Sequence, residues 1–258
     1  MSDIAQLNAD YGITDHVTFE EGEGGMSVVQ VSNPLAEARI TLQGAHITRW
    51  APQGEQPVIW VSEDAKFAPG KSIRGGVPLC WPWFGPHETE SSYPAHGFAR
   101  TVPWTVIATE QLDDGRTRLQ FQIEDTDQGR EQWPYPTELT LTLTVGRSLD
   151  IDLCTRNTGT EPMTVGQALH TYFEVSDVSQ VQLHGLEGCD YVDKVDDFKR
   201  KQQDGAVTID QEVDRIYLGS VADCLLDDPG MKRRIRISKQ GSASTVVWNP
   251  WQATAEKM

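Results

Sequence analysis

Strict alternation of apolar and polar residues places the strongest restriction on the possible folds of this chain. In residues 138–145, ELTLTLTV, apolar side chains occupy every second position from Leu139 to Val145. Successive side chains of a β-strand point to opposite faces, so this pattern predicts a strand with one buried face. After a short Gly-Arg connection, residues 149–153 alternate again. The two segments together predict an antiparallel hairpin.

The same alternation recurs along most of the sequence. A second hairpin is predicted from residues 102–108 and 118–124, which flank an Asp-Asp-Gly turn. Convincing helical periodicity is scarce, and short helical turns are expected only in the first dozen residues and at residues 63–66. The pattern indicates an all-β, largely antiparallel sandwich or barrel with few short helices. Further strands are predicted at residues 26–31, 38–44, 207–218, 233–239 and 244–249.

Composition limits the classes of partner and compartment. The 258 residues include 22 Lys and Arg against 38 Asp and Glu, a formal charge of −16. Such a charge repels nucleic acids and anionic membranes, so neither is expected as a partner. There is no apolar run near the ~18 residues of a membrane-spanning helix, and the first residues do not resemble a signal peptide. The widely separated cysteines suggest neither a disulfide framework nor a zinc knuckle, and a soluble, cytoplasmic protein is expected.

Residues 69–103 hold the densest run of Pro and Gly, yet they are also rich in aromatic residues. Linkers are rarely so aromatic, so this segment predicts an ordered functional loop system on a single β domain that spans residues 1–258. Within it, KSIRGGVPLCWPWFGP places Arg74 before two glycines, where a guanidinium can hold a phosphate or carboxylate bidentately. The alternative is a surface arginine beside a tight turn, with the Trp and Phe side chains filling the core.

A second motif, AHGFAR at residues 95–100, contains His96 and Arg100. If Arg100 converged with Arg74, the pair would suit a dianion such as a phosphate monoester. A buried, hydrogen-bonded histidine with a salt-bridged arginine is the alternative interpretation.

In the third motif, QALHTYFEV at residues 167–175, an extended backbone places His170 and Tyr172 on one face. Histidine transfers protons readily near neutral pH, although a lone strand histidine is often structural. Asp214, beside Arg215 in EVDRIY, is a candidate ligand for sugar hydroxyls, whereas most of the acidic residues are expected on the surface.

Other catalytic signatures are missing from the sequence. The histidines show neither HxH nor HExxH spacing, so no metal is expected. A serine nucleophile elbow, a Walker loop and a dinucleotide-binding glycine motif are also absent.

Taken together, SIRGGVPLCWPWFGP, HGFAR, LHTYFEV, DRIY and VVWNPW resemble, in this order, the motifs of the hexose-6-phosphate mutarotases. These enzymes, the glucose-6-phosphate 1-epimerases, belong to the aldose 1-epimerase superfamily, and the resemblance runs from about residue 28 to the end. It implies the galactose-mutarotase-like fold, a large antiparallel β-sandwich whose concave face holds the sugar.

The resemblance also implies a reaction and a role for each candidate residue. The reaction is interconversion of the α and β anomers of an aldohexose 6-phosphate such as glucose 6-phosphate, through ring opening and reclosure, without a cofactor. His170 corresponds to the catalytic acid and His96 to a second histidine of the site. Arg74 and Arg100 correspond to positions that bind the substrate, where they are expected to contact its phosphate, and Asp214 corresponds to a substrate-contacting aspartate. The protein is expected to act as a monomer or weak dimer.

One departure from the family pattern affects these expectations. The general base of the family is a glutamate on a strand after VVWNPW, whereas this sequence ends at Met258 and Glu256 does not match that position. We therefore expect the domain to lack its C-terminal strand or strands, with turnover reduced by roughly 10²–10⁴-fold. A noncatalytic carbohydrate-binding sandwich and an epimerase for unphosphorylated aldoses are the alternatives.

Overall fold

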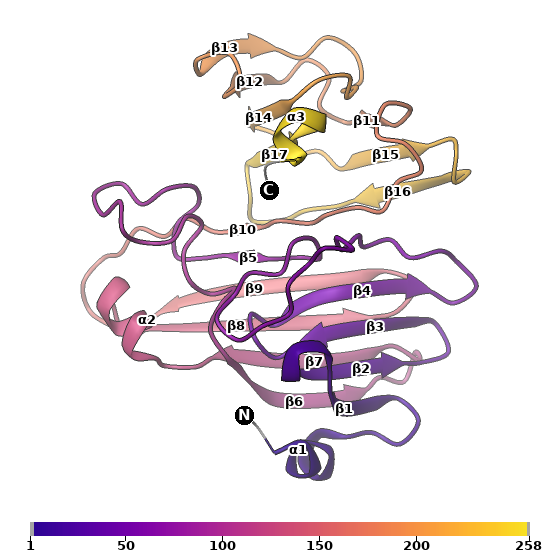
Figure 1. Ribbon diagram of the computed structural model, residues 1–258, viewed down its shortest axis with the longest axis vertical. Helices are drawn as coiled ribbons and strands as arrows, with labels where there is room; N and C mark the ends of the chain where they lie inside the picture. Colours follow the sequence, from indigo (N-terminus) through magenta and orange to yellow (C-terminus); the bar gives the residue numbers. More distant parts are fainter. Residues whose placement is uncertain (1–2, 257–258) are drawn as a thin grey trace. The chain divides into compact units, whose positions relative to one another are not determined.

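The structure is a computed structural model that describes residues 3–256, and Figure 1 shows the order of its elements along the chain. The chain forms two compact units, of which the first ends at Glu174 and the second begins at Val175. All pairings between the labelled strands of the described chain are antiparallel, which confirms the predicted all-β antiparallel class. The helices are short: α1 (Ile4–Tyr11), the 3-10 turn η1 (Glu23–Gly25), α2 (Asp127–Gln132) and α3 (Trp251–Ala255).

The first unit contains two four-stranded sheets. One follows the chain order β1 (Val17–Glu21), β2 (Ser27–Ser32), β3 (Ala36–Thr41) and β4 (His46–Pro52). The other follows the order β6 (Trp104–Gln111), β7 (Thr117–Ile123), β8 (Thr137–Val145) and β9 (Leu149–Asn157). Both predicted hairpins are confirmed, as β6–β7 and β8–β9.

The alternation that predicted β8 corresponds directly to its burial. Leu139, Leu141 and Leu143 are fully buried, whereas Thr140 and Thr142 between them are half-buried. Each buried leucine contributes about 1.5–3 kcal/mol through removal of its side chain from water. The hydrophobic face of β8 is therefore part of the core that holds the first unit together.

The two sheets of the first unit contact each other as layers. Strand β3 contacts β8, and Asn33 Nδ2 donates a buried hydrogen bond to the Val145 carbonyl at 3.0 Å. Trp50 Nε1 on β4 donates to the Gly146 carbonyl at 3.2 Å. A short third pairing joins β5 (Leu79–Cys80) to β10 (Ala168–Leu169). This pairing brings the candidate loops of residues 74–100 beside the segment that carries His170.

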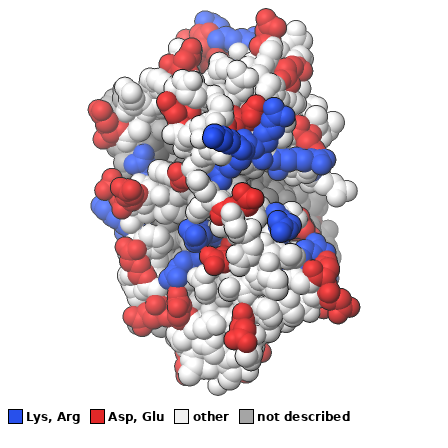
Figure 2. Space-filling model, turned by 90° about the vertical axis from the view of Figure 1, so that its right-hand side faces the viewer, with Lys and Arg blue, Asp and Glu red and all other residues white. Residues whose placement is uncertain are grey.

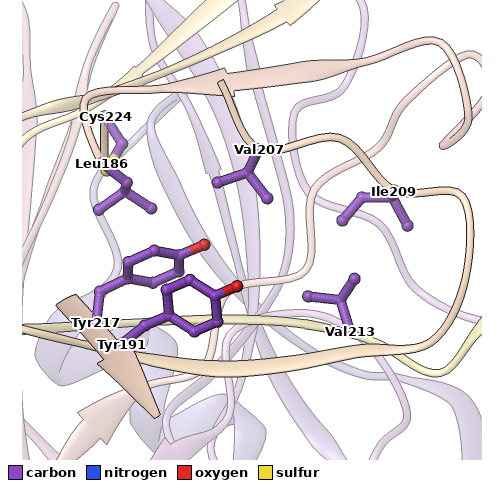
Figure 3. Close-up of a cluster of buried hydrophobic side chains, with 7 residues drawn as sticks. All are labelled: Leu186, Tyr191, Val207, Ile209, Val213, Tyr217 and Cys224. Atoms are coloured by element: carbon purple, nitrogen blue, oxygen red, sulfur yellow. The ribbon is translucent and has the colours of Figure 1, made fainter. Parts of the chain in front are cut away.

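The second unit has its own strands and its own core. One sheet has the order β13 (Lys199–Gln202), β12 (Asp190–Asp193), β14 (Val213–Leu218) and β17 (Ser244–Asn249), and the other has β11 (Gln182–His184), β15 (Cys224–Asp228) and β16 (Arg233–Ile237). Figure 3 shows the buried cluster, in which the rings of Tyr191 and Tyr217 lie 5.1 Å apart. The Tyr217 hydroxyl donates to Gln203 Oε1 at 2.7 Å, so this buried polar group is satisfied.

Two local predictions are wrong. The strand predicted at residues 207–218 begins only at Val213, because the preceding residues bury Val207 and Ile209 without forming a continuous ladder. Residues 63–66 form a turn with a hydrogen bond from Ala65 to the Ser62 carbonyl, not a helix. The helix expected in the first dozen residues is confirmed as α1.

Acidic and basic side chains are interspersed on the face shown in Figure 2. Many of the basic groups have acidic partners, among them Arg236 with Asp223 at 2.6 Å and Lys201 with Asp193 at 2.8 Å. Over residues 3–256, no helix is long and apolar enough to cross a membrane.

Candidate functional site

The segment of residues 74–78, which carries Arg74, is held by hydrogen bonds to three neighbouring parts of the first unit. Gly75 and Gly76 adopt positive φ angles of 106° and 71°, which most other residues avoid. Their conformation turns successive carbonyl groups toward different neighbours. The Arg74 carbonyl accepts from the Ser62 N–H at 3.0 Å, and the Gly75 carbonyl accepts from the His46 ring at 2.9 Å. The Gly76 carbonyl accepts from the Tyr172 N–H at 2.9 Å, and the Pro78 carbonyl accepts from the His170 N–H at 3.0 Å.

His96 lies in the loop between β5 and β6 and has a defined ring orientation. Its backbone N–H donates to the Gly85 carbonyl at 2.7 Å, and the Gly85 N–H donates to His96 Nδ1 at 3.1 Å. Because Nδ1 accepts a hydrogen bond, the ring proton is on Nε2. The Phe84 and His96 rings pack in a T-shaped arrangement with a centroid distance of 4.9 Å. The loop therefore presents His96 as an Nε2–H donor.

The structure brings His96 and His170 together. Their ring centroids are 6.2 Å apart, and the ring planes are nearly perpendicular at 85°. The His170 ring also stacks on Tyr172, with a centroid distance of 4.8 Å and an interplanar angle of 20°. The predicted placement of His170 and Tyr172 on one face is confirmed, although only Ala168–Leu169 of this motif forms a strand.

Both predicted arginines act electrostatically on Tyr172. Burial raises the pKa of Tyr172, and the charges of Arg100 and Arg74 oppose that rise. The two guanidinium groups therefore lie within electrostatic reach of the ring that stacks on His170. Arg100 also opposes the effect of burial on Cys80, which raises the pKa of this thiol to about 11. The thiol is thus held protonated, which makes Cys80 unsuited to nucleophilic chemistry.

Arg100 has hydrogen-bonding capacity left in this arrangement. Its Nη2 donates to the Ala95 carbonyl at 2.8 Å. Its buried Nε has no hydrogen-bond partner among residues 3–256. The alternative that Arg100 is a salt-bridged structural residue has no support, because none of the ion pairs within the described chain involves it. A guanidinium with an unused donor is suited to receive an anion.

Asp214 lies on β14 and belongs to the second unit, whereas the other candidate residues belong to the first. Lys194 Nζ donates to its carboxylate at 2.5 Å. The contact of Asp214 with a substrate stays a prediction.

The aromatic residues of the loop divide between core and site. Trp81 is 3% exposed, and its Nε1 donates to Thr155 Oγ1 at 3.1 Å, so it fills the core as the alternative interpretation proposed. Trp83 is half-buried and stacks with Tyr93 at 6.0 Å. Within the described residues, no group of three or more His, Cys, Asp or Glu side chains is arranged to hold a metal ion.

Sequence reasoning missed His46 as part of this region. The ring is 1% exposed and bonds the Gly75 carbonyl, next to Arg74. Its sequence signal is weak, a histidine at the start of an apolar strand two residues after Gly44. A contact across 29 positions of the chain is not visible in such a local pattern.

Comparisons with known proteins agree with this fold. The family model described as aldose 1-epimerase matches residues 27–258. A relative from Escherichia coli K12 named "Putative glucose-6-phosphate 1-epimerase" is 38% identical over 234 residues, which is 90% of this chain and 77% of the relative. A crystal structure of YeaD from Salmonella typhimurium, titled a "putative mutarotase", superposes with a TM-score of 0.89 at 33% identity, over 99% of this chain and 85% of that one.

A more distant structure supports the fold alone. The galactose mutarotase related enzyme of Lactobacillus acidophilus has a TM-score of 0.71 at 15% identity and covers 87% of this chain and 81% of its own. The antiparallel sheets and this likeness define a galactose-mutarotase-like β-sandwich protein. Since the family model and the relatives span most of its length, the chain belongs to the aldose 1-epimerase family, the enzymes that interconvert sugar anomers.

Proposed function

We propose that this protein interconverts the α and β anomers of an aldohexose 6-phosphate, with glucose 6-phosphate as its substrate. The observation that carries the proposal is the proximity of His96 and His170, whose ring centroids are 6.2 Å apart. Beside them, the charges of Arg74 and Arg100 both act on the pKa of Tyr172. Names of relatives that refer to glucose 6-phosphate support the choice of substrate.

Opening of the sugar ring requires two proton movements. A proton is delivered to the ring oxygen as the bond between this oxygen and C1 breaks, while the C1 hydroxyl loses its proton and becomes the aldehyde. In the proposal His170 delivers the first proton. His96 polarises the ring oxygen through its Nε2–H, whose position the Gly85 hydrogen bond fixes. After rotation about the C1–C2 bond, the same movements in reverse close the ring on the other face, and no cofactor takes part.

The general base that receives the proton of the C1 hydroxyl is a group other than His170. Acid and base have to flank the anomeric centre during ring opening, so one side chain does not fill both positions at once.

Arg74 and Arg100 are proposed to bind the phosphate of the substrate. Two guanidinium groups suit a phosphate dianion, because each offers paired N–H donors to its oxygens. Their charges are also conspicuous in a chain with a net charge of −16. Asp214 is proposed to accept hydrogen bonds from sugar hydroxyls.

We further propose a cytoplasmic protein that works as a monomer or weak dimer, without nucleic acid or membrane partners. The strong negative charge disfavours polyanions and anionic lipid surfaces. Four free cysteines, at positions 80, 154, 189 and 224, suit a reducing compartment.

Exchange spectroscopy by NMR on the two anomers of glucose 6-phosphate tests the proposal, because spontaneous exchange gives a baseline. We expect the protein to accelerate the exchange, His170→Ala to abolish the acceleration, and the control His184→Ala to retain it. His184 is half-exposed in the second unit and contacts Glu187 at 3.1 Å. An exchange rate equal to the baseline contradicts the enzyme and favours a noncatalytic sugar-binding protein. Faster exchange of free glucose than of glucose 6-phosphate favours an epimerase for unphosphorylated aldoses.

A further inference from the structure

Residues 42–46 contact both loops that carry the candidate phosphate-binding arginines. They comprise the turn that joins β3 to β4 and His46, the first residue of β4. On one side they reach the segment that follows Arg74, and on the other they pack against the backbone at Arg100. Residues 42–46 lie outside all of the sequence motifs that predicted the site.

His46 makes the contact with the Arg74 loop. Three of the four accepting carbonyls in residues 74–78 are bonded to backbone N–H groups, and that of Gly75 is bonded to His46 Nε2 at 2.9 Å. Because a carbonyl only accepts, Nε2 carries the ring proton and Nδ1 does not. Nδ1 is buried and has no hydrogen-bond partner in the described part of the chain. The ring is therefore committed to one interaction, the support of the Gly75 carbonyl.

The charge state of His46 favours this role. Burial lowers its pKa to about 4, the Gly75 hydrogen bond opposes the decrease, and the Arg100 charge adds to it. The ring is neutral at physiological pH, so the Nε2–H donor and the bare Nδ1 coexist there. The hydrogen bond is thus maintained across the pH range of ordinary metabolism.

The His46 ring packs so closely against Gly76 that a larger residue does not fit there. A Cβ atom on Gly76 would lie 2.2 Å from His46 Nε2 and 2.5 Å from the Ile47 carbonyl oxygen. Such distances are far below ordinary van der Waals contact. The imidazole therefore defines how closely the Arg74 loop approaches β4.

The other end of the turn holds the Arg100 loop. Gly44 has a φ of 74°, and a Cβ atom there would lie 2.7 Å from the Arg100 carbonyl oxygen. Its N–H donates to the Val102 carbonyl at 2.9 Å. The Gln43 side chain donates to the Lys71 carbonyl at 2.8 Å and accepts from the Gly70 N–H at 2.7 Å. The short segment of residues 42–46 is thus bonded to both loops.

We propose that residues 42–46 are a positioning element, with His46 as its central side chain, that sets the spacing between Arg74 and Arg100. This inference rests on the proposed function, in which these arginines bind the phosphate. His46 is a positioning residue because it acts through the Gly75 carbonyl. Since bidentate contacts to phosphate depend on geometry, a change in this spacing weakens binding of the phosphorylated sugar.

The test compares His46→Leu, which removes the donor, with His46→Gln, whose amide N–H can replace it. Trp50→Phe is the matched control, since Trp50 also lies on β4 and its buried ring N–H also donates to a carbonyl, that of Gly146. Gln43→Ala is a second test variant. Gln43 is only half-buried, so its loss is compatible with folding even if His46→Leu proves unstable.

We expect His46→Leu to raise the KM for glucose 6-phosphate by about tenfold, as for loss of one good charge-assisted contact, with little change in kcat. His46→Gln should restore most of the affinity, and Gln43→Ala should raise KM by a smaller factor. Trp50→Phe should lower the melting temperature without a change in KM. For free glucose, kcat/KM should be equal in all variants, because no phosphate is bound.

Three results overturn the inference: an unchanged KM in both His46→Leu and Gln43→Ala, a loss confined to kcat, or an equal rise of KM in Trp50→Phe. Calorimetric titration with glucose 6-phosphate separates this inference from the proposed function. If the unmodified protein binds the sugar phosphate but does not accelerate exchange, the proposed function fails, and weaker binding by the His46 and Gln43 variants still supports the inference. Equal dissociation constants across all variants overturn it, as does a protein that binds no glucose 6-phosphate.

Discussion

The imidazole of His170 stacks on the phenol ring of Tyr172, with ring centroids 4.8 Å apart and planes inclined by 20°. The Tyr172 ring also packs against Trp60, with a centroid distance of 5.9 Å. The proposed acid is therefore oriented by a flat surface that is itself supported by the first unit. Orientation matters because proton transfer requires the donor nitrogen within hydrogen-bonding reach of the ring oxygen.

Two replacements of Tyr172 distinguish the role of its aromatic ring from that of its hydroxyl group. We expect Tyr172→Leu to lower kcat by about tenfold, because the stacking surface that orients His170 is lost. Tyr172→Phe keeps this surface and should retain kcat within about twofold of the unmodified protein. Exchange spectroscopy at saturating glucose 6-phosphate measures both values. Equal kcat for the leucine and phenylalanine variants would show that stacking does not orient the acid.

The proposed phosphate site predicts strong loss of affinity when both arginines are removed. The double variant Arg74→Leu, Arg100→Leu should raise the dissociation constant for glucose 6-phosphate by at least about 100-fold, because hydrogen bonds to charged groups contribute roughly 1.5–3 kcal/mol each. Calorimetric titration at two salt concentrations measures the change. Arg118→Leu is the control, since Arg118 forms an exposed ion pair with Glu110 at 3.1 Å. An unchanged dissociation constant in the double variant would falsify the assignment.

The buried His46 predicts a pH dependence of stability. In the unfolded chain the His46 pKa has its ordinary value of 6.5, whereas in the folded protein it is lowered to about 4. Between these values unfolding takes up a proton, so the free energy of unfolding decreases as the pH falls from 6.5 toward 4. The free energy of unfolding above pH 6.5 therefore exceeds that below pH 4 by roughly 3 kcal/mol on account of His46.

Urea unfolding at pH 7 and pH 4.5 measures this dependence in the unmodified protein and in His46→Gln. The variant should lose less of its free energy of unfolding over this interval, because its amide does not titrate. Equal losses in the two proteins would mean that His46 titrates normally in the folded state.

Gly76 predicts a steric effect that can be separated from backbone strain. Gly54 has a similar positive φ of 79°, but a Cβ atom there would meet nothing within 4 Å. Gly54→Ala should therefore destabilise the protein by about 1–2 kcal/mol, the cost of a left-handed conformation. Gly76→Ala should cost at least about 2 kcal/mol more, since its Cβ overlaps His46 and the Ile47 carbonyl. Chemical denaturation of both variants tests the difference, and equal losses would argue against a close-packed turn.

Much of the scaffold could be predicted from local patterns. The alternation in residues 138–145 identified β8 and the hairpin with β9, because burial of one strand face repeats every two residues and is legible in a short segment. The same logic failed at residues 207–212, where Val207 and Ile209 are buried without a continuous ladder. There the apolar pattern reflects packing of a loop on the core of the second unit.

The candidate site was predictable only as separate motifs. His170 and Tyr172 could be placed on one face because they are two residues apart, and the ring stacking confirms it. The approach of His96 to His170 depends on hydrogen bonds between segments that are distant in the chain, such as that from the His170 N–H to the Pro78 carbonyl. Asp214 shares a sequence motif with the family, but its contact with the substrate stays a prediction.

Local sequence patterns were sufficient to predict the antiparallel β class, the main hairpins and the residue types available for proton transfer and anion binding, because these depend on neighbours in the chain. By contrast, the sequence did not reveal that a buried, neutral His46 supports the Gly75 carbonyl beside Arg74, or that Gly44 packs on Arg100, and the folded chain shows both contacts. Such contacts join residues tens of positions apart and arise from close packing and hydrogen-bond satisfaction in the folded interior.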